Sequence, residues 1–211
     1  MANLLTILRM ILAVIAIEFL FTGSPALSIT AIFLTLFVIV LDGLDGYVAR
    51  KLNEQSKFGS VFDILGDRVV ENLYWIAFAV IGTVGVWVPM VVVTRGIITD
   101  GLRSIALSKG YTAFGESSMM KNKFCHFLTA SRFSRAIYGV AKTLVFLMLI
   151  IAYIPNLEFY DCMTVDQFVL YSSIQPYLIT TANVLVYITV AMCVIRGLPV
   201  IFESKRYLDE D

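Results

Sequence analysis

The chain has 211 residues, of which 59% are hydrophobic and only 15% are charged, and its formal net charge is zero. Soluble domains are usually about 45–50% apolar and about 25% charged, so this composition excludes an ordinary soluble domain and indicates an integral membrane protein. A neutral chain offers no bulk electrostatic attraction to a polyanion, so nucleic acid is not expected as a partner.

Six apolar segments follow one another along the chain, each near the 20 or so residues that a helix needs to cross a bilayer. The first contains Arg9 and Glu18 inside its apolar run and has no positive charge before it, so it is interpreted as a retained transmembrane helix rather than a secretory signal. We predict an all-α polytopic membrane protein with six transmembrane helices in a single domain over residues 1–211. The predicted spans are 4–22, 28–50, 61–83, 86–108, 132–154 and 176–202.

Lysine and arginine gather at alternate connections between these spans. They occur between spans two and three, between spans four and five, and after span six, whereas the other three connections contain none. The positive-inside rule therefore predicts cytoplasmic termini, and an even number of spans agrees with that. We expect a multi-pass protein of the inner (cytoplasmic) membrane.

The connection over residues 110–131 is too polar to cross a membrane. Within it, Phe124, Phe127 and Leu128 alternate with basic residues, a pattern typical of a short helix lying on the inner membrane surface. A solvated loop explains the same composition equally well.

Four aspartates flank the connection between the second and third spans. Asp42 and Asp45 are three residues apart, and Asp63 and Asp67 are four apart, so each pair lies on one face of its helix. The short connection lets the two pairs face each other near the cytoplasmic boundary. Carboxylates that close cannot all remain ionised without a cation among them, and magnesium prefers such hard oxygen ligands. Two such ions can clamp a diphosphate.

A purely structural reading is that these aspartates cap helices and pair with Arg50, Lys51 or Arg68. Ionisable residues within a membrane cost roughly 2.5–3.5 kcal/mol each, however, and usually mark function. The small residues beside the acids indicate space for a ligand or a close backbone approach, although close helix packing explains any one of them. These small residues are Gly46, Ala49 and Gly59.

The string Asp42-x2-Asp45-Gly46-x2-Ala49-Arg50-x8-Gly59-x3-Asp63-x3-Asp67 resembles the CDP-alcohol phosphotransferase signature DxxDGxxARx8GxxxDxxxD at every fixed position. The resemblance implies six transmembrane helices, coverage of nearly the whole chain, and a homodimer. It implies transfer of a phosphatidyl group from a CDP-linked lipid such as CDP-diacylglycerol to a small alcohol, with CMP released at the cytoplasmic side of the membrane.

The same resemblance assigns roles to residues. Asp42, Asp45, Asp63 and Asp67 would hold two Mg²⁺ or Mn²⁺ ions on the CDP diphosphate, and Asp67 would act as the general base. The nucleotide would be bound by Gly46, Ala49, Arg50 and Gly59. At the N-terminus, Asn3, Thr6 and Arg9 form an NxLTxxR pattern that is similar to bacterial phosphatidylglycerophosphate synthases, which adds Asn3 and Thr6 to the nucleotide site. A snorkelling cation with two polar residues at a helix start is the alternative reading.

Cations in the second half of the chain point to a phosphorylated acceptor, because guanidinium groups bind phosphate in bidentate fashion. "TRGIITDGLR", with Arg95 and Arg103, and "YGVAKT", with Lys142, are similar to segments of phosphatidylglycerophosphate synthases. Together with Arg135 they favour sn-glycerol 3-phosphate as the acceptor. Arg132 is a further candidate. Pairing with Asp100 and positive-inside anchoring are the structural alternatives.

Three departures from that subfamily keep other acceptors open: "DILGDR" over residues 63–68, Gly96 in place of a usual glutamate, and a long connection over 110–131. The Asp-Arg ending resembles inositol-accepting relatives, so phosphatidylinositol-phosphate synthesis from inositol 1-phosphate is the alternative. Rival classes are an intramembrane prenyltransferase, an ion-coupled transporter and a non-catalytic scaffold.

Overall fold

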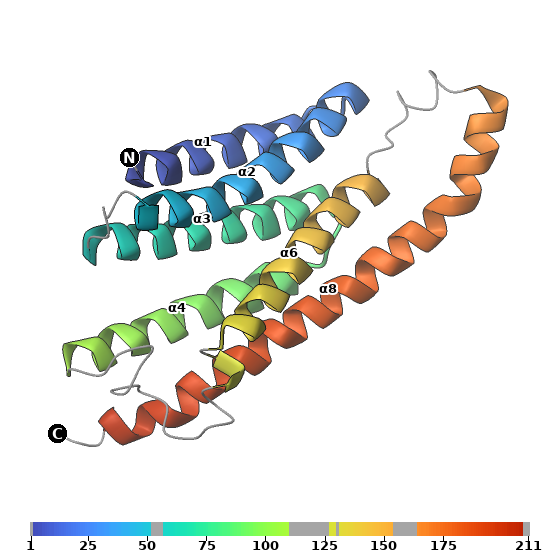
Figure 1. Cartoon of the computed structure of the whole chain (residues 1–211). Helices are drawn as coiled ribbons and strands as arrows, with labels where there is room; N and C mark the ends of the chain where they lie inside the picture. The colour runs from blue at the N-terminus through green and yellow to red at the C-terminus, as the bar shows by residue number, and fades with distance from the viewer. Residues whose placement is uncertain (1, 52–56, 110–126, 130, 154–163, 209–211) are drawn as a thin grey trace. The chain divides into compact units, whose positions relative to one another are not determined.

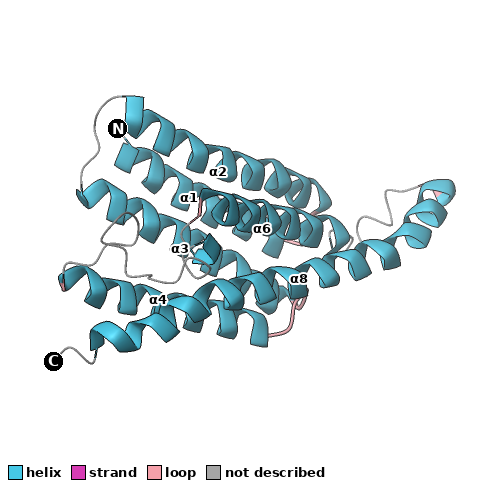
Figure 2. Ribbon diagram, turned by 60° about the horizontal axis from the view of Figure 1, so that its bottom comes forward, coloured by secondary structure: helices cyan, strands magenta, loops and turns pink. Residues whose placement is uncertain are grey.

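The computed structural model describes residues 2–51, 57–109, 127–129, 131–153 and 164–208, and the long elements in these ranges are all helices (Figures 1 and 2). Six of them are labelled in Figure 1. They are α1 (Ala2–Phe21), α2 (Pro25–Lys51), α3 (Lys57–Ile81), α4 (Trp87–Ser108), α6 (Arg132–Tyr153) and α8 (Val165–Leu208). The all-α prediction is therefore confirmed for the described residues.

Two glycines with a positive φ follow the ends of helices. Gly23 follows α1 with a φ of 71°, and Gly82 follows α3 with a φ of 86°. Residues with a β-carbon rarely adopt this left-handed backbone conformation, which explains why glycine stands at both turns. After the first turn, Pro25 begins α2, a position where its missing N–H costs nothing.

The first of two compact units comprises residues 1–86 and 143–184. Within it, α1 packs against both α2 and α3 (Figure 1). Aromatic side chains of α3 enclose Phe146 of α6: the Tyr74 ring stacks on it at 5.0 Å between centroids, and Trp75 meets it edge-on at 5.1 Å. A buried 2.8 Å hydrogen bond between the hydroxyls of Thr35 and Tyr74 joins α2 to α3.

The second unit comprises residues 87–142 and 185–211, so α6 and α8 each contribute to both units. Here the Trp87 ring of α4 stacks on Tyr187 of α8 with 5.7 Å between centroids. Tyr138 of α6 is buried, with the Lys142 ammonium 5.2 Å and the Arg196 guanidinium 5.0 Å from its ring centroid. These contacts hold α6 and α8 together within this unit. The single-domain prediction over residues 1–211 stays a prediction.

Among the residues that the structure describes, four stretches are long and apolar enough to cross a membrane: Asn3–Phe21, Ala26–Gly43, Phe127–Ala152 and Val169–Ser204. They correspond to α1, α2, α6 and α8, and their exposed leucine, phenylalanine and valine side chains are suited to a lipid environment. A membrane protein is consistent with these helices. The two further spans, predicted where α3 and α4 form, stay predictions.

The last helix differs from the prediction. It begins at Val165 rather than 176 and runs for 44 residues, or about 66 Å at 1.5 Å per residue. Residues 165–175 contain no glycine or proline, and Asp166 in the first turn stabilises a helix N-terminus. Helix α8 is therefore longer than one bilayer crossing requires. The predicted interfacial segment at 110–131 lies outside the described residues except for 127–129, which are helical, and Ser131.

Candidate functional site

Three of the four predicted aspartates converge between α2 and α3. Carboxylate oxygens of Asp42, Asp63 and Asp67 all lie within 4.8 Å of one another. Their side chains are 43–48% exposed, so the cluster is partly open to its surroundings. Asp45 lies one turn beyond Asp42 on α2, and its side chain is outside what the structure describes.

A cation that was not predicted to join this cluster lies inside it. The Arg9 side chain of α1 is 2% exposed, and its Nη1 forms ion pairs with Oδ1 of Asp42 and, at 3.0 Å, with Oδ1 of Asp67. Nη2 lies 3.6 Å from Oδ1 of Asp63. The signal was present in the sequence, because an arginine in an apolar helix needs an anionic partner.

Gly66 explains how Arg9 reaches the aspartates. A β-carbon at residue 66 would lie 2.5 Å from Cγ2 of Thr6 and 3.0 Å from Nη2 of Arg9, so a larger residue would force a shift. Thr6, predicted at the nucleotide site, is buried against this glycine, and Asn3 is partly buried one turn earlier. The close approach of α1 to α3 therefore depends on a missing side chain.

The remaining predicted nucleotide residues lie next to the cluster in the chain. Gly59 is in the first turn of α3 and is partly buried. Gly46, Ala49 and Arg50 lie in the last turns of α2, and their side chains are outside the described part of the structure. Their role in nucleotide binding stays a prediction.

The predicted acceptor residues belong to the second unit, whereas the aspartates belong to the first, so their role also stays a prediction. Arg103 pairs with Asp100 at 3.3 Å, which is the structural alternative expected for it. Arg135 is exposed on α6, and the side chain of Arg132 is not among those that the structure describes. Lys142 lies against Tyr138. Arg196, which sequence reasoning missed, lies against the same ring.

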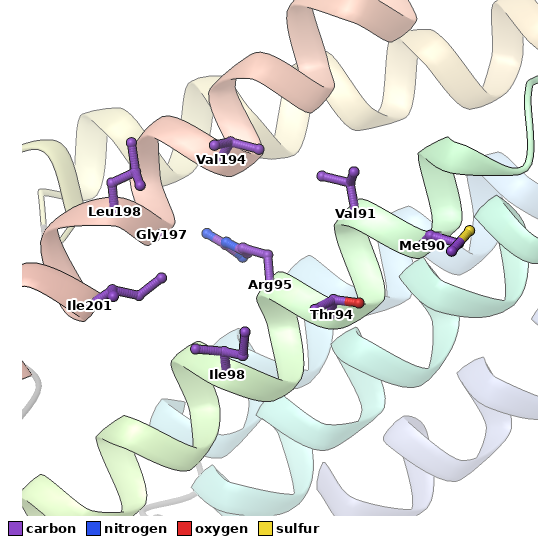
Figure 3. Close-up of a pocket in the computed structure, with 9 residues that line it drawn as sticks. All are labelled: Met90, Val91, Thr94, Arg95, Ile98, Val194, Gly197, Leu198 and Ile201. Carbon is purple, nitrogen blue, oxygen red and sulfur yellow. The ribbon is translucent and has the colours of Figure 1, made fainter.

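Arg95 lies in a cavity of about 400 Å³ between α4 and α8 (Figure 3). Figure 3 shows its side chain reaching from α4 toward Gly197 of α8. The walls are otherwise largely apolar, and the lining residues are Met90, Val91, Thr94, Arg95, Ile98, Val194, Gly197, Leu198 and Ile201. A concave, mostly apolar site with one convergent charged group is a common form of ligand pocket.

The aspartate cluster has the donor chemistry of a magnesium or manganese site. Ligands on opposite sides of one Mg²⁺ lie about 4.2 Å apart, twice the metal–oxygen distance of about 2.1 Å. Each of the three carboxylates offers an oxygen within 4.8 Å of the others, which is close to this value. The residues present therefore fit a divalent ion.

The family comparison accounts for this arrangement. The model for CDP-alcohol phosphatidyltransferase matches residues 1–195, which include all four aspartates. The chain belongs to the CDP-alcohol phosphatidyltransferase family. Members of this family typically use a divalent metal, in agreement with the fit of the aspartate cluster.

Several relatives carry names of one enzyme type. A CDP-diacylglycerol–glycerol-3-phosphate 3-phosphatidyltransferase of Mycoplasma genitalium is 38% identical over 77 residues, covering 36% of this chain and 33% of the relative. The protein of the same name from Treponema pallidum is 30% identical over 115 residues, covering 53% of each. A CDP-diacylglycerol–inositol 3-phosphatidyltransferase of Arabidopsis thaliana is 36% identical over 67 residues, covering 32% of this chain and 28% of the relative. The chain spans about a third to a half of the length of the curated relatives it matches.

Proposed function

We propose that this protein transfers a phosphatidyl group from CDP-diacylglycerol to the hydroxyl of sn-glycerol 3-phosphate, giving phosphatidylglycerophosphate and CMP. The observation that carries the proposal is the convergence of Asp42, Asp63 and Asp67 at the positions of the family signature. The names of the relatives support the same donor and the same acceptor.

The four aspartates are the proposed ligands of two Mg²⁺ or Mn²⁺ ions. When bound, the ions neutralise the diphosphate of the donor and stabilise the charge that develops on CMP as it leaves. Asp42 and Asp45 would contribute from α2, and Asp63 and Asp67 from α3. The partial exposure of the described carboxylates supports this role, because a lipid-linked diphosphate must reach them from the membrane boundary.

Asp67 is the proposed general base. It takes the proton of the acceptor hydroxyl as that oxygen bonds to the lipid-side phosphorus and the bond from this phosphorus to CMP breaks. Its side chain is 48% exposed, which leaves it open to an incoming alcohol. Holding both reactants at one place supplies much of the rate enhancement in such transfers.

The nucleotide is proposed to lie beside the aspartates, against the small residues of α2 and the first turn of α3. Gly46, Ala49 and Gly59 leave room for it, and Arg50, Asn3 and Thr6 supply polar contacts. The support is their spacing in the family signature and the short distance in sequence between Gly59 and Asp63.

Cations of the second unit are proposed to bind the phosphate of the acceptor. They are Arg95, Arg103, Arg135 and Lys142, to which the structure adds Arg196, because it shares the Tyr138 ring with Lys142. Arg95 reaching into a cavity supports a ligand-binding role for that residue. Inositol 1-phosphate is the second candidate acceptor, favoured by "DILGDR" and by the name of the plant relative.

The proposed location is the inner membrane, with the site on the cytoplasmic side, as the distribution of lysine and arginine favours. A homodimer is proposed from the family resemblance. Membrane lipid would then be both the surroundings of the apolar helices and the source of the donor.

An acceptor panel tests the activity. Purified protein in liposomes is given CDP-diacylglycerol, Mg²⁺ and one of glycerol 3-phosphate, inositol 1-phosphate, inositol, serine or choline, and CMP release is measured. We expect release with glycerol 3-phosphate. Release with inositol 1-phosphate alone would reassign the acceptor within the family. If none of the five acceptors supported CMP release, the proposed transfer to these alcohols would be overturned.

A further inference from the structure

Arg9 pairs with the same carboxylates that would bind the metal. Its Nη1 uses Oδ1 of Asp42 and Oδ1 of Asp67, and its Nη2 faces Oδ1 of Asp63. These three aspartates are also the group whose oxygens lie within 4.8 Å of one another. One set of carboxylates would therefore face two cations, one supplied by the protein and one from solution.

The burial of the two sides differs sharply. The Arg9 side chain is 2% exposed, whereas the three carboxylates are 43–48% exposed. A metal ion would thus reach the aspartates from their open side and meet the guanidinium behind them. Two cations at such short range repel each other, and a buried guanidinium is poorly screened by water or salt.

The position of the guanidinium is set by its neighbours on α1 and α3. Gly66 leaves the space that Nη2 uses, and Thr6 fills the remainder of the same gap. Arg9 is therefore guided toward the aspartates by close packing as well as by charge. A methyl group at residue 66 would press on Thr6 and on the guanidinium without changing any charge.

We propose that Arg9 competes with the divalent ion for Asp42, Asp63 and Asp67, and so sets how tightly the cluster binds metal. The inference rests on the proposed metal site. Arg9 neutralises the carboxylates when no ion is bound, and ion binding requires it to give up part of these contacts. Arg9 is here a positioning residue, because it acts on the metal through the aspartates.

Metal binding to the full chain in detergent tests the competition directly. Mn²⁺ is titrated in the absence of any lipid donor, and free Mn²⁺ is followed by its electron paramagnetic resonance signal. For Arg9→Gln we expect Mn²⁺ to bind about tenfold more tightly than to the unaltered protein, within the usual range of coupling between two sites. Equal or weaker binding by this variant overturns the proposal.

Arg68→Gln is the matched control for charge. It removes the same charge from α3, at a side chain that pairs with Glu71 at 3.5 Å. We expect its Mn²⁺ affinity to change by less than about threefold, because the Arg68 side chain is 22% exposed and solvent screens a partly exposed charge. An increase as large as that of Arg9→Gln would mean that general charge explains the effect, which also overturns the competition.

A second pair of variants preserves every charge and keeps the proposal testable if Arg9→Gln does not fold. Gly66→Ala should displace Nη2 and tighten Mn²⁺ binding, whereas Gly43→Ala, with nothing within 4 Å of its added carbon, should not. Unchanged or weaker binding by Gly66→Ala contradicts the proposal.

Absence of Mn²⁺ binding in every form, the unaltered protein included, would overturn the proposed metal site itself. Metal-dependent CMP release with an unchanged Mn²⁺ affinity in Arg9→Gln would overturn only the role of Arg9.

Discussion

The Arg95 side chain passes directly over the backbone of Gly197. A β-carbon at residue 197 would lie 2.8 Å from Nε and 2.9 Å from Cγ of Arg95, distances that real β-carbons essentially never show. The arginine of α4 can therefore extend along α8 into the cavity only because α8 carries a glycine there (Figure 3). This relationship makes the proposed acceptor role of Arg95 testable without removing its charge.

Gly197→Ala should raise the KM for glycerol 3-phosphate by about tenfold, because a displaced guanidinium loses part of a charge-assisted hydrogen bond worth about 1.5–3 kcal/mol. The KM for CDP-diacylglycerol should change little. Steady-state CMP release at varied acceptor concentration provides the measurement. Gly101→Ala on α4 is the control, since its added carbon meets nothing within 4 Å. An unchanged acceptor KM in Gly197→Ala would remove Arg95 from the proposed phosphate site.

Asp67→Asn should lower CMP release by about 10²–10⁴-fold, the usual contribution of a general base. The amide keeps the size of the side chain but cannot take the acceptor proton. Glu18→Gln is the control, because Glu18 is an exposed carboxylate on α1 with no assigned role, and its activity should stay within about twofold. Full activity of Asp67→Asn would rule out the proposed base.

Chelation of divalent ions should abolish CMP release, and added Mg²⁺ or Mn²⁺ should restore it. The reason is that Asp42, Asp63 and Asp67 have the oxygen donors and spacing for such an ion. Asp42→Asn should need a higher metal concentration for half-maximal activity, whereas Glu18→Gln should need the same concentration as the unaltered protein. Activity that persists after exhaustive chelation would contradict metal-assisted transfer.

The hydrogen bond between Thr35 and Tyr74 makes an asymmetric prediction for stability. Thr35 donates to the carbonyl of Ala31 at 2.7 Å, so its single hydroxyl hydrogen is used and the Tyr74 hydroxyl is the donor between the two helices. Tyr74→Phe should cost about 0.5–1.5 kcal/mol, because it removes the donor and leaves Thr35 paired. Thr35→Val should cost more, about 1–3 kcal/mol, because it leaves a buried phenol unpaired.

Unfolding of these variants in detergent provides the comparison. Thr30→Val is the matched control for Thr35→Val: Thr30 makes the same hydrogen bond to the carbonyl four residues earlier, that of Ala26, but it is exposed. Its loss should change the free energy of unfolding by less than about 0.5 kcal/mol. Equal effects of Thr35→Val and Tyr74→Phe would show that the direction of the hydrogen bond is not as assigned.

The elements of the fold were largely predictable from the sequence. Apolar runs of the right length located the long helices labelled in Figure 1. The predicted span begins at Pro176, whereas α8 runs through this proline and begins at Val165. Helix boundaries depend on local signals of this kind, so errors are confined to the ends.

The contacts of the candidate site were predictable where they join residues close together in the sequence. Fixed spacing and a short connection are sufficient to bring Asp42 toward Asp63 and Asp67. Arg9 was recognisable in the sequence as a cation in an apolar helix, but its position in the sequence did not predict that these aspartates are its partners. Arg196 was missed because its relation to Tyr138 joins two helices that are distant in the sequence.

The sequence by itself determined the helices, their apolar character and the acidic signature of the family, because these follow from composition and from spacing within one or two turns. Only the tertiary structure decided that Arg9 enters the carboxylate cluster, and that glycines at 66 and 197 admit an arginine from another helix. Such relations depend on which helix faces meet and how closely, and that is settled by packing among residues far apart in the chain.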